Sequence, residues 1–552
     1  MQSLKLQGWF ADFNARDFFL GIMEIDSGKI ISITQTKEQR SNWPEIDILH
    51  PLILPGLIDA HVHIESSMVM PTRFAEMASR YGTVATVSDP HEIANVLGVE
   101  GIRLMIKDAK KAVFPICFTA PSCVPATPFE SAGAVLEAAQ LEPLFFNKEV
   151  YALGEVMNYP GVIQGVKEVI DKIRLAEKYG TPVDGHAPGV RGRELERYIS
   201  AGIHTDHECF ALDEAEEKVE KGMKILIREG SDAKNFEVLW PLISKYPDRV
   251  MLCTDDFQPD ELAKGHIDRF IRRGLAKGLS FFDLYQAGSL NPVAHYGIPV
   301  GTLKEGDKAD FILVDDLNEF HVLSTWIRGI SIYGPDAEPI KLPDIQILNR
   351  FEAQPVNPDD LRILGKGGLF NVISAYDGGL ITEAKKIQLT ENKGVINYSL
   401  NRDILKIVVI NRYEPAVPSV AWIQGFGIRQ GAMASSIAHD SHNVIAVGTN
   451  DETLARAINL VIRNRGGIAV CSDTFEDCLP LPVAGLMSIM SVEETGRRYR
   501  ELTERVRSLG SMLQAPFMTL SFMALLVIPH LKIGDGGLFD SDRFRFIPLR
   551  AE

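Results

Sequence analysis

Short apolar segments alternate with longer amphipathic segments between residues 53 and 298. In the amphipathic stretches Val162–Tyr179 and Gly192–Ala201, apolar residues recur at helical spacing, which predicts helices. Between such stretches, eight apolar segments of suitable length predict strands: Ile53–His63, Thr83–Asp89, Ile116–Ser122, Tyr151–Val156, Pro182–His186, His204–Glu208, Lys224–Arg228 and Val250–Asp255. Strands that alternate with helices pair in parallel through right-handed crossovers. The pattern therefore predicts an α/β fold with a TIM-like (β/α)8 barrel at residues 54–298.

The sequence on both sides of the barrel predicts further domains. Apolar stretches with a turn signal at residues 26–28 precede the barrel, and a turn followed by a strand pattern, Gly301–Val314, comes after it. We therefore predict a small flanking β-sandwich domain built from residues 1–53 and 299–345. A proline-containing linker is predicted at 346–364, and a separate C-terminal α+β domain at 365–552.

Composition limits which binding partners and which cellular compartment we expect for this protein. The net charge of −16 argues against a nucleic-acid partner, because polyanions are bound by clustered Lys and Arg. The apolar segment Phe517–Ile528 is shorter than the roughly 20 residues that cross a bilayer, so it is predicted to be a buried core element. Six scattered cysteines and an N-terminus without a signal-like segment are typical of a reducing cytoplasm. We expect a cytoplasmic homo-oligomer, a dimer, with no membrane partner.

Polar side chains gather where the predicted barrel strands end. His61 and His63 lie two positions apart, so both point to the same side of the first strand. Other strand ends carry the remaining members of a six-residue set: Glu155, His186, His207 and Asp255. Six ligands are too many for one ion with an open position and fit two, with the Glu155 carboxylate as a bridge. Such a centre activates water for hydrolysis.

Each of these residues also has a simpler interpretation. His186 alone is compatible with a loop histidine, His207 with a histidine solvated by neighbouring carboxylates, and Asp255 with a helix N-cap. Their common position at the strand ends of one barrel favours the metal site. The remaining histidines that lack such a setting are interpreted as structural or surface residues: His50, His204, His266, His295, His321 and His530.

Longer motifs extend this pattern along nearly the whole chain: Pro55–His63, Ser88–Asn95, Gly154–Asn158, Thr205–Glu208, Ala434–Asn443 and Pro516–Phe522. Together they resemble the adenine deaminase family of the amidohydrolase superfamily. The resemblance implies a binuclear centre, commonly of manganese or iron, that converts adenine and water into hypoxanthine and ammonia in purine salvage. It implies the same six metal ligands, with Glu155 where many relatives in the superfamily have a carboxylated lysine. Histidine and carboxylate ligands also suit zinc, so the metals stay open.

The resemblance also suggests catalytic roles. Asp255, besides contacting metal, is expected to take a proton from the attacking hydroxide and to hand it to the departing ammonia. Glu92 and His91 are candidates for protonating or hydrogen-bonding ring nitrogen N1, with loop structure as the alternative. The run containing His439, Asp440 and His442 is predicted either to close over the barrel mouth, to bind an additional metal, or to form a solvated turn.

The chain departs from the family pattern at Tyr413, Glu414 and Ile489, where His-Gly and an acidic residue are expected. These departures leave adenine and a related aminopurine open as substrates, and they leave the role of the C-terminal domain open. An amidohydrolase that cleaves a cyclic amide is a second alternative, and an inactive scaffold of this fold is a third. A small zinc-type nucleobase deaminase is excluded, because no Pro-Cys-x-x-Cys motif follows His61-Val62-His63-Ile64-Glu65.

Overall fold

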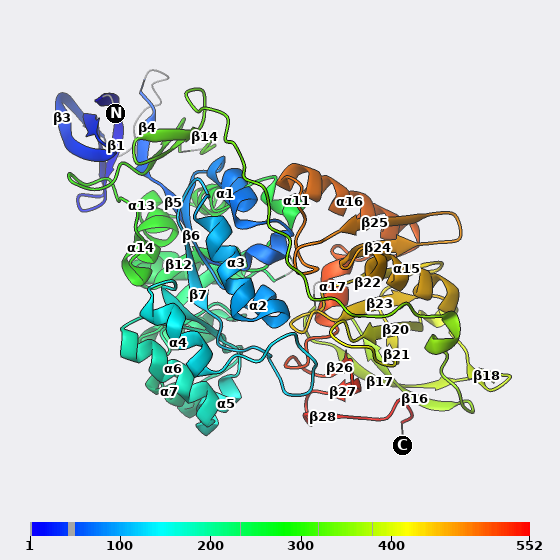
Figure 1. Cartoon of the computed structure of the whole chain (residues 1–552). Helices are drawn as coiled ribbons and strands as arrows, with labels where there is room; N and C mark the ends of the chain where they lie inside the picture. The colour runs from blue at the N-terminus through cyan, green and yellow to red at the C-terminus, as the bar shows by residue number, and fades with distance from the viewer. Residues whose placement is uncertain (1–2, 42–49, 232, 318, 378, 552) are drawn as a thin grey trace. The chain divides into compact units, whose positions relative to one another are not determined.

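The computed structural model describes residues 3–41, 50–231, 233–317, 319–377 and 379–551 (Figure 1). They divide into two compact units. The first, here called the barrel unit, comprises the described residues of 1–90, 105–122 and 137–344. The second, the C-terminal unit, comprises those of 91–104, 123–136 and 345–552. Two segments inside the range predicted for the barrel, 91–104 and 123–136, therefore pack with the C-terminal unit.

The barrel unit contains eight short parallel strands in barrel order. Five form one sheet: β5 (Leu57–Val62), β6 (Thr83–Ser88), β7 (Ile116–Ala120), β8 (Ala152–Val156) and β9 (Val183–Gly185). Three form the other: β10 (Thr205–Asp206), β11 (Lys224–Arg228) and β12 (Val250–Cys253). Contacts of β9 with β10 and of β12 with β5, and a parallel bridge between Val62 and Asp255, close the ring. The predicted (β/α)8 fold class is confirmed.

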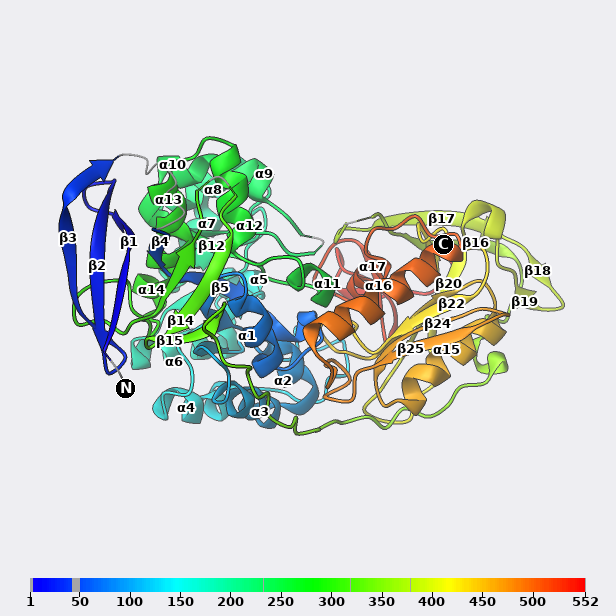
Figure 2. The same ribbon diagram turned by 90° about the horizontal axis from the view of Figure 1, so that it is seen from above.

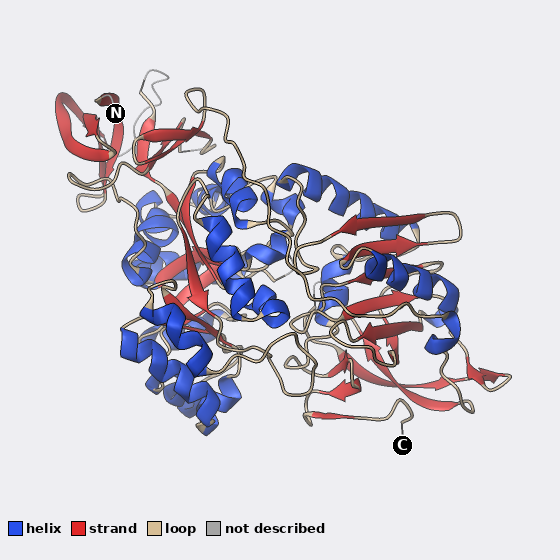
Figure 3. Ribbon diagram, in the orientation of Figure 1, coloured by secondary structure: helices blue, strands red, loops and turns tan. Residues whose placement is uncertain are grey.

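Helices follow the strands and surround them (Figure 3). The helices of this unit are α1 (Pro71–Ser79), α4 (Ala138–Phe146), α5 (Tyr159–Gln164), α6 (Lys167–Tyr179), α7 (Gly192–Ser200), α8 (Leu212–Glu220), α9 (Phe236–Leu239), α10 (Pro241–Lys245), α11 (Pro259–Leu262), α12 (Asp268–Ala276), α13 (Phe281–Tyr285) and α14 (Asn291–Tyr296). Helix α2 (His91–Leu97) belongs to the C-terminal unit, and α3 (Val99–Ala109) spans the boundary at residue 104. Apolar helix faces and strand residues share one large core that includes Ile58, Val87 and Leu252.

Two predicted elements are each divided in the structure. The predicted strand Ile53–His63 is two strands, β4 (Leu52–Pro55) and β5, which join different sheets. The break falls at Gly56, where a Cβ atom would lie 2.1 Å from Val84 Cγ1, so only glycine allows this close approach. The predicted helix Val162–Tyr179 is divided into α5 and α6 at Gly165, whose φ of +73° ends the first helix in the left-handed conformation.

Both flanks of the barrel contribute to one seven-stranded sheet, in the order β15-β14-β13-β4-β1-β2-β3. Besides β4, its strands are β1 (Leu4–Asp12), β2 (Asp17–Asp26), β3 (Lys29–Ser41), β13 (Phe311–Val314), β14 (Val322–Ile327) and β15 (Ile330–Tyr333). Phe10, Ile53 and Phe311 pack in its core, so residues from both ends of the barrel sequence meet there. Residues 1–2 and 42–49 of the predicted flanking domain lie outside the described residues.

The C-terminal unit is built on an eight-stranded sheet in the order β17-β16-β21-β20-β23-β22-β24-β25. Its strands are β16 (Gly368–Ser374), β17 (Glu383–Leu389), β20 (Leu405–Ile410), β21 (Ser419–Gln424), β22 (Ala432–Ser435), β23 (Val444–Gly448), β24 (Gly467–Cys471) and β25 (Glu476–Pro480). Helices α15 (Asp451–Arg463) and α16 (Val492–Ser508) contact this sheet (Figure 2). The smaller strands form two further sheets. One pairs β18 (Glu391–Asn392) with β19 (Val395–Ile396), and the other has the order β26 (Leu531–Gly534), β27 (Gly537–Asp540), β28 (Arg545–Phe546).

The segment predicted as a linker, 346–364, packs onto the C-terminal unit. Phe351, Val356 and Leu361 are buried in the core that α15 and the sheet share. The segment contains one short 3-10 helix, Pro358–Leu361, and is otherwise irregular, yet these side chains are buried. The predicted core element at Phe517–Ile528 overlaps helix α17 (Pro516–Phe522), which is buried throughout. No helix among the described residues has both the length and the apolar character needed to span a membrane.

Candidate metal centre

The six predicted ligands come together at the C-terminal ends of the barrel strands. Strands β5 and β8 carry His61 and Glu155, and the other four residues follow the ends of β5, β9, β10 and β12. His186 is partly exposed and the other five are buried. Parallel strands present their carboxyl ends at one face of the barrel, and this places six residues from distant sequence positions in one cluster.

Glu155 lies between two pairs of histidines. Its Oε1 is 3.9 Å from His61 Nε2 and 3.2 Å from His63 Nε2. Its Oε2 is 2.6 Å from His186 Nδ1 and 3.2 Å from His207 Nε2. Each carboxylate oxygen thus faces one pair of imidazoles, so the cluster offers donor atoms on both sides of Glu155.

Asp255 completes the cluster on the side of the first pair. Its Oδ1 lies 3.5 Å from His61 Nε2 and 3.2 Å from His63 Nε2, and its Oδ2 accepts a short hydrogen bond from Arg228 Nη1. Asp255 has a φ of +57°, a left-handed conformation uncommon for a residue with a side chain. Strain of this kind collects at functional sites, where surrounding contacts hold the residue in place.

The donor atoms of the cluster are suited to divalent metal. His61 Nε2 and His207 Nε2 are buried and make no hydrogen bond among the described residues. His63 Nδ1 lies 3.0 Å from the carbonyl oxygen of Asp89, so it is the protonated nitrogen and Nε2 offers its lone pair to the cluster. Imidazole and carboxylate donors at these strand ends suit zinc, manganese and iron.

The electrostatics of the cluster favour a positive charge at its centre. Burial alone would lower the pKa of His63 and of His207. Asp255 and Glu155 raise the pKa of His63 well above its usual range, and Glu155 and Glu208 do the same for His207. Burial alone would raise the pKa of Glu155, but the surrounding histidines, His186 first, hold it well below its usual range. A bound cation would take the place of the protons that these rings otherwise hold.

Two charged residues near the centre were not predicted from the sequence. Arg228, at the end of β11, donates to both carboxylate oxygens of Glu208, at 2.5 and 2.7 Å, as well as to Asp255. Glu208 Oε1 in turn lies 3.5 Å from His186 Nδ1 and 3.4 Å from His207 Nε2. Glu208 directly follows the predicted ligand His207, and this position in the sequence could have indicated it as a site residue. Nothing in the local sequence indicates Arg228.

Lys218 of α8 supports two of the ligand loops. Its fully buried ammonium donates to Asp206 Oδ2, Glu214 Oε1 and the Ala187 carbonyl, each at 2.7 Å. Asp206 Oδ1 accepts from the Ala187 amide at 2.9 Å. Asp206 precedes His207 and Ala187 follows His186, so one lysine connects the segments that present both imidazoles.

A second support lies beneath Glu155. Asp89 Oδ2 accepts a hydrogen bond of 2.9 Å from the Glu155 amide, while the Asp89 carbonyl accepts from His63. Gly154 leaves room for this contact, because a Cβ there would lie 2.1 Å from Asp89 Oδ2. Hydrogen bonds of this kind fix the orientation of metal ligands.

The other predicted site residues meet in the C-terminal unit. Glu92 and His91 begin α2, and Glu92 lies between two imidazoles of the 437–443 loop: its Oε1 is 2.6 Å from His439 Nδ1, and its Oε2 contacts His442 Nε2. Asp440 Oδ1 is 3.7 Å from His439 Nδ1. All five side chains are buried, so the solvated turn considered for His439, Asp440 and His442 is wrong.

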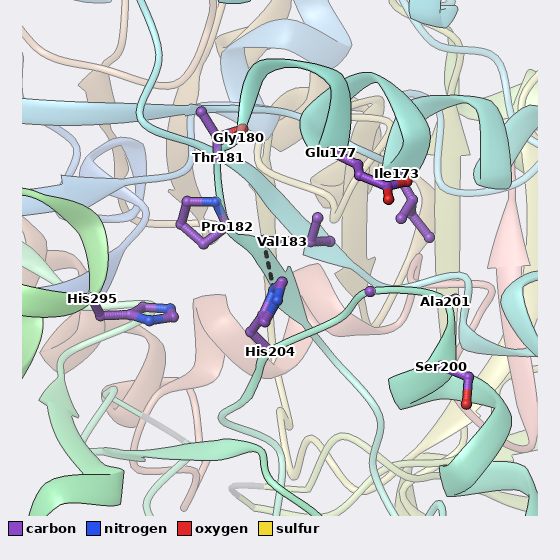
Figure 4. A pocket seen from close by; sticks show the side chains of 11 residues that line it. Ile173, Glu177, Gly180, Thr181, Pro182, Val183, Ser200, Ala201, His204 and His295 are labelled. Atoms are coloured by element: carbon purple, nitrogen blue, oxygen red, sulfur yellow. Dashed lines mark hydrogen bonds between the residues drawn. The ribbon is translucent and has the colours of Figure 1, made fainter.

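A cavity of the barrel unit lies away from the ligand cluster. It is lined by residues around the starts of β9 and β10, including Pro182, His204 and His295 (Figure 4). The ring of His204 faces the Val183 amide at 3.4 Å. This is the N-terminal end of the barrel strands, whereas the ligands occupy the C-terminal ends, where barrel enzymes carry their chemistry.

A (β/α)8 barrel with a histidine and carboxylate cluster at the ends of its strands defines the class of the amidohydrolases. Residues 52–332 match the model of the amidohydrolase family, and residues 379–545 match the model of the adenine deaminase C-terminal domain. The chain belongs to the adenine deaminase family.

The chain is similar over nearly its whole length to proteins named as adenine deaminases. It is 48% identical over 561 residues to an adenine deaminase of Methanosarcina mazei, covering 99% of this chain and 100% of that protein. It is 49% identical to an adenine deaminase of Methanosarcina barkeri, with 99% of each chain covered. It is 48% identical to an adenine deaminase of Salinibacter ruber, covering 99% and 98% of the two chains.

Proposed function

We propose that this protein hydrolyses adenine to hypoxanthine and ammonia at a two-metal centre held by His61, His63, Glu155, His186, His207 and Asp255. The observation that carries the proposal is the position of Glu155, with one oxygen toward each pair of histidines. The full-length relatives named as adenine deaminases support adenine as the substrate.

Two divalent cations bound here would supply a hydroxide near neutral pH by lowering the pKa of a shared water. The protein supplies the proton transfers. Asp255 is ionised because Arg228, together with the neighbouring histidines, outweighs the effect of burial and holds its pKa well below the usual range. An ionised Asp255 accepts the proton released as oxygen adds to C6 of adenine, and returns it to the amino group that departs as ammonia.

The proton at ring nitrogen N1 requires a different residue. Burial would raise the pKa of Glu92, but His439, His442 and His91 hold it well below the usual range. An ionised carboxylate accepts protons and does not donate them, so Glu92 is a poor proton donor at neutral pH. Of the two predicted candidates for this role, we therefore retain His91.

We further propose manganese or iron as the resident metals, with zinc as an alternative, because all three accept imidazole and carboxylate ligands. The cysteines at positions 117, 123, 209, 253, 471 and 478 are free, which supports a reducing cytoplasmic location. We also propose a homodimer, which light scattering after gel filtration would test.

The decisive experiment is turnover by protein that has been stripped of metal and reloaded separately with Mn²⁺, Fe²⁺ or Zn²⁺. Adenine, adenosine, other aminopurines and cyclic amides are offered, and hypoxanthine, ammonia and ring opening are measured. We expect hypoxanthine from adenine and no ring opening. Metal-loaded protein that releases no ammonia from adenine would refute the proposed function. Turnover of another aminopurine alone would replace only the substrate.

The same panel addresses the departures from the family pattern. Glu414 and Ile489 are exposed, whereas Tyr413 is buried and its hydroxyl donates to the Ser441 carbonyl at 2.5 Å. Tyr413 thus supports the 437–443 loop through the backbone. This loop contains His439 and His442, so the residue at position 413 contacts the loop that carries these two histidines.

A further inference from the structure

A second group of buried imidazole and carboxylate side chains lies in the C-terminal unit. We propose that Glu92, His439 and His442 hold a third divalent cation, with Asp440 as an additional oxygen donor. This site adds to the two-metal centre of the proposed function and does not depend on the identity of its substrate.

Carboxylate and imidazole side chains are paired in both units. In the barrel, Glu155 presents each oxygen to imidazole nitrogens, the nearest at 2.6 Å. In the C-terminal unit, Glu92 presents Oε1 to His439 Nδ1 at 2.6 Å and Oε2 to His442 Nε2. The rings of His439 and His442 lie 5.8 Å apart, so both flank one carboxylate. Two nitrogens and a carboxylate facing one another are a donor set for a divalent cation.

An oxygen donor remains unused if no cation is present. Asp440 Oδ2 is buried and makes no hydrogen bond among the described residues. A buried carboxylate oxygen without a partner loses the solvation that it had in water. A hydrogen-bonded chain in which both imidazoles donate to Glu92 would satisfy that carboxylate but not Asp440. A cation beside Asp440 offsets its charge as well as that of Glu92.

The loop that carries the histidines is held in place before any ligand binds. Arg412 donates through Nη1 to the His442 carbonyl at 3.2 Å, and through its amide to Asn443 Oδ1 at 3.0 Å. Asn443 Nδ2 donates to the Ser131 carbonyl at 3.1 Å. His442 itself has a φ of +55°, which costs energy for a side-chain-bearing residue. Backbone held in this way is typical of a preorganised site.

Zn²⁺ is the most suitable probe, because it binds imidazole and carboxylate donors more tightly than manganese or iron does. Metal-free full-length protein is dialysed against buffered Zn²⁺, and bound zinc is counted by mass spectrometry. We expect three ions per chain. We expect two in His439→Gln and in His442→Gln, each checked for folding by circular dichroism.

A matched control is available in the same unit. His530 also pairs with a carboxylate, 2.5 Å from Asp542 Oδ2, but is about half exposed. His530→Gln is expected to retain three ions. Two ions in the unaltered protein would overturn the proposal, and so would three ions in both loop variants.

A crystallographic measurement avoids dependence on the variants. Zinc-loaded crystals of the unaltered protein should give an anomalous peak about 2.0–2.2 Å from His439 Nδ1, His442 Nε2 and a Glu92 oxygen. Absence of this peak in crystals that show both barrel ions would refute the third site. Such a result would leave the proposed deaminase untouched, whereas three bound ions without adenine turnover would refute the deaminase alone.

Discussion

Replacing Lys218 with methionine tests whether a buried lysine positions the metal ligands. The substitution removes the ammonium and keeps most of the apolar side chain. It leaves the carboxylates of Asp206 and Glu214, both buried, without the cation that each contacts at 2.7 Å. Removing one partner of a buried ion pair costs about 3–5 kcal/mol. A large domain loses about 2–4 °C in melting temperature per kcal/mol, so the melting temperature of the barrel unit should fall by roughly 6–20 °C.

Differential scanning calorimetry of the metal-loaded protein measures the transition, and metal analysis measures occupancy. We expect barrel metal to be lost together with stability, because Asp206 and Ala187 adjoin His207 and His186. Lys221→Met is the matched control, since Lys221 pairs with Glu196 at 2.7 Å at the surface, where such a pair contributes at most about 1 kcal/mol. Equal effects of the two substitutions would refute the positioning role. Lys218→Met with Asp206→Asn should recover part of the loss, because one stranded charge is gone.

Three further predictions test separate parts of the structure. Gly154→Ala should displace Asp89 from the Glu155 amide and weaken metal binding about 10–100-fold in a chelator-competition titration; unchanged affinity would contradict the support assigned to Asp89. Asp255→Asn should lower kcat for adenine about 10²–10⁴-fold, and near-normal turnover would exclude it as the proton acceptor. Burial lowers the pKa of Lys532 to about 7. Above this pH Lys532 is neutral in the folded chain and protonated in the unfolded chain. The free energy of unfolding should therefore rise with pH by up to about 1.4 kcal/mol per pH unit. Urea titrations at pH 7, 8 and 9 should show this rise in the unaltered protein and not in Lys532→Met.

The barrel was predictable because its strands and helices differ in local period and because strand order follows sequence order. The spacing of His61 and His63 was equally local, since alternation along a strand puts both on one side. The division of Ile53–His63 into two strands was not predictable in this way. It depends on how closely Val84 approaches Gly56, a contact between segments that the local pattern does not record.

The residues that were missed are those whose role comes from a distant partner. Lys218 lies on an amphipathic helix, where a lysine ordinarily faces water, and only the position of Asp206 explains its burial. Arg228 has no local pattern that distinguishes it from a surface arginine at a strand end. Glu92 was recognised as a site residue from its motif, yet its imidazole partners lie more than three hundred positions later in the sequence.

The assignment of segments 91–104 and 123–136 to the C-terminal unit has a consequence for dissecting the protein. The chain passes from one unit to the other five times, after residues 90, 104, 122, 136 and 344. A fragment that stops at residue 344 would keep both segments but lose the rest of the unit with which they pack, exposing buried residues such as Ile93, Val96 and Leu136. The barrel is therefore not a cassette that can be expressed, swapped or grafted by cutting at one place; a soluble fragment would need these two excursions shortened to polar turns.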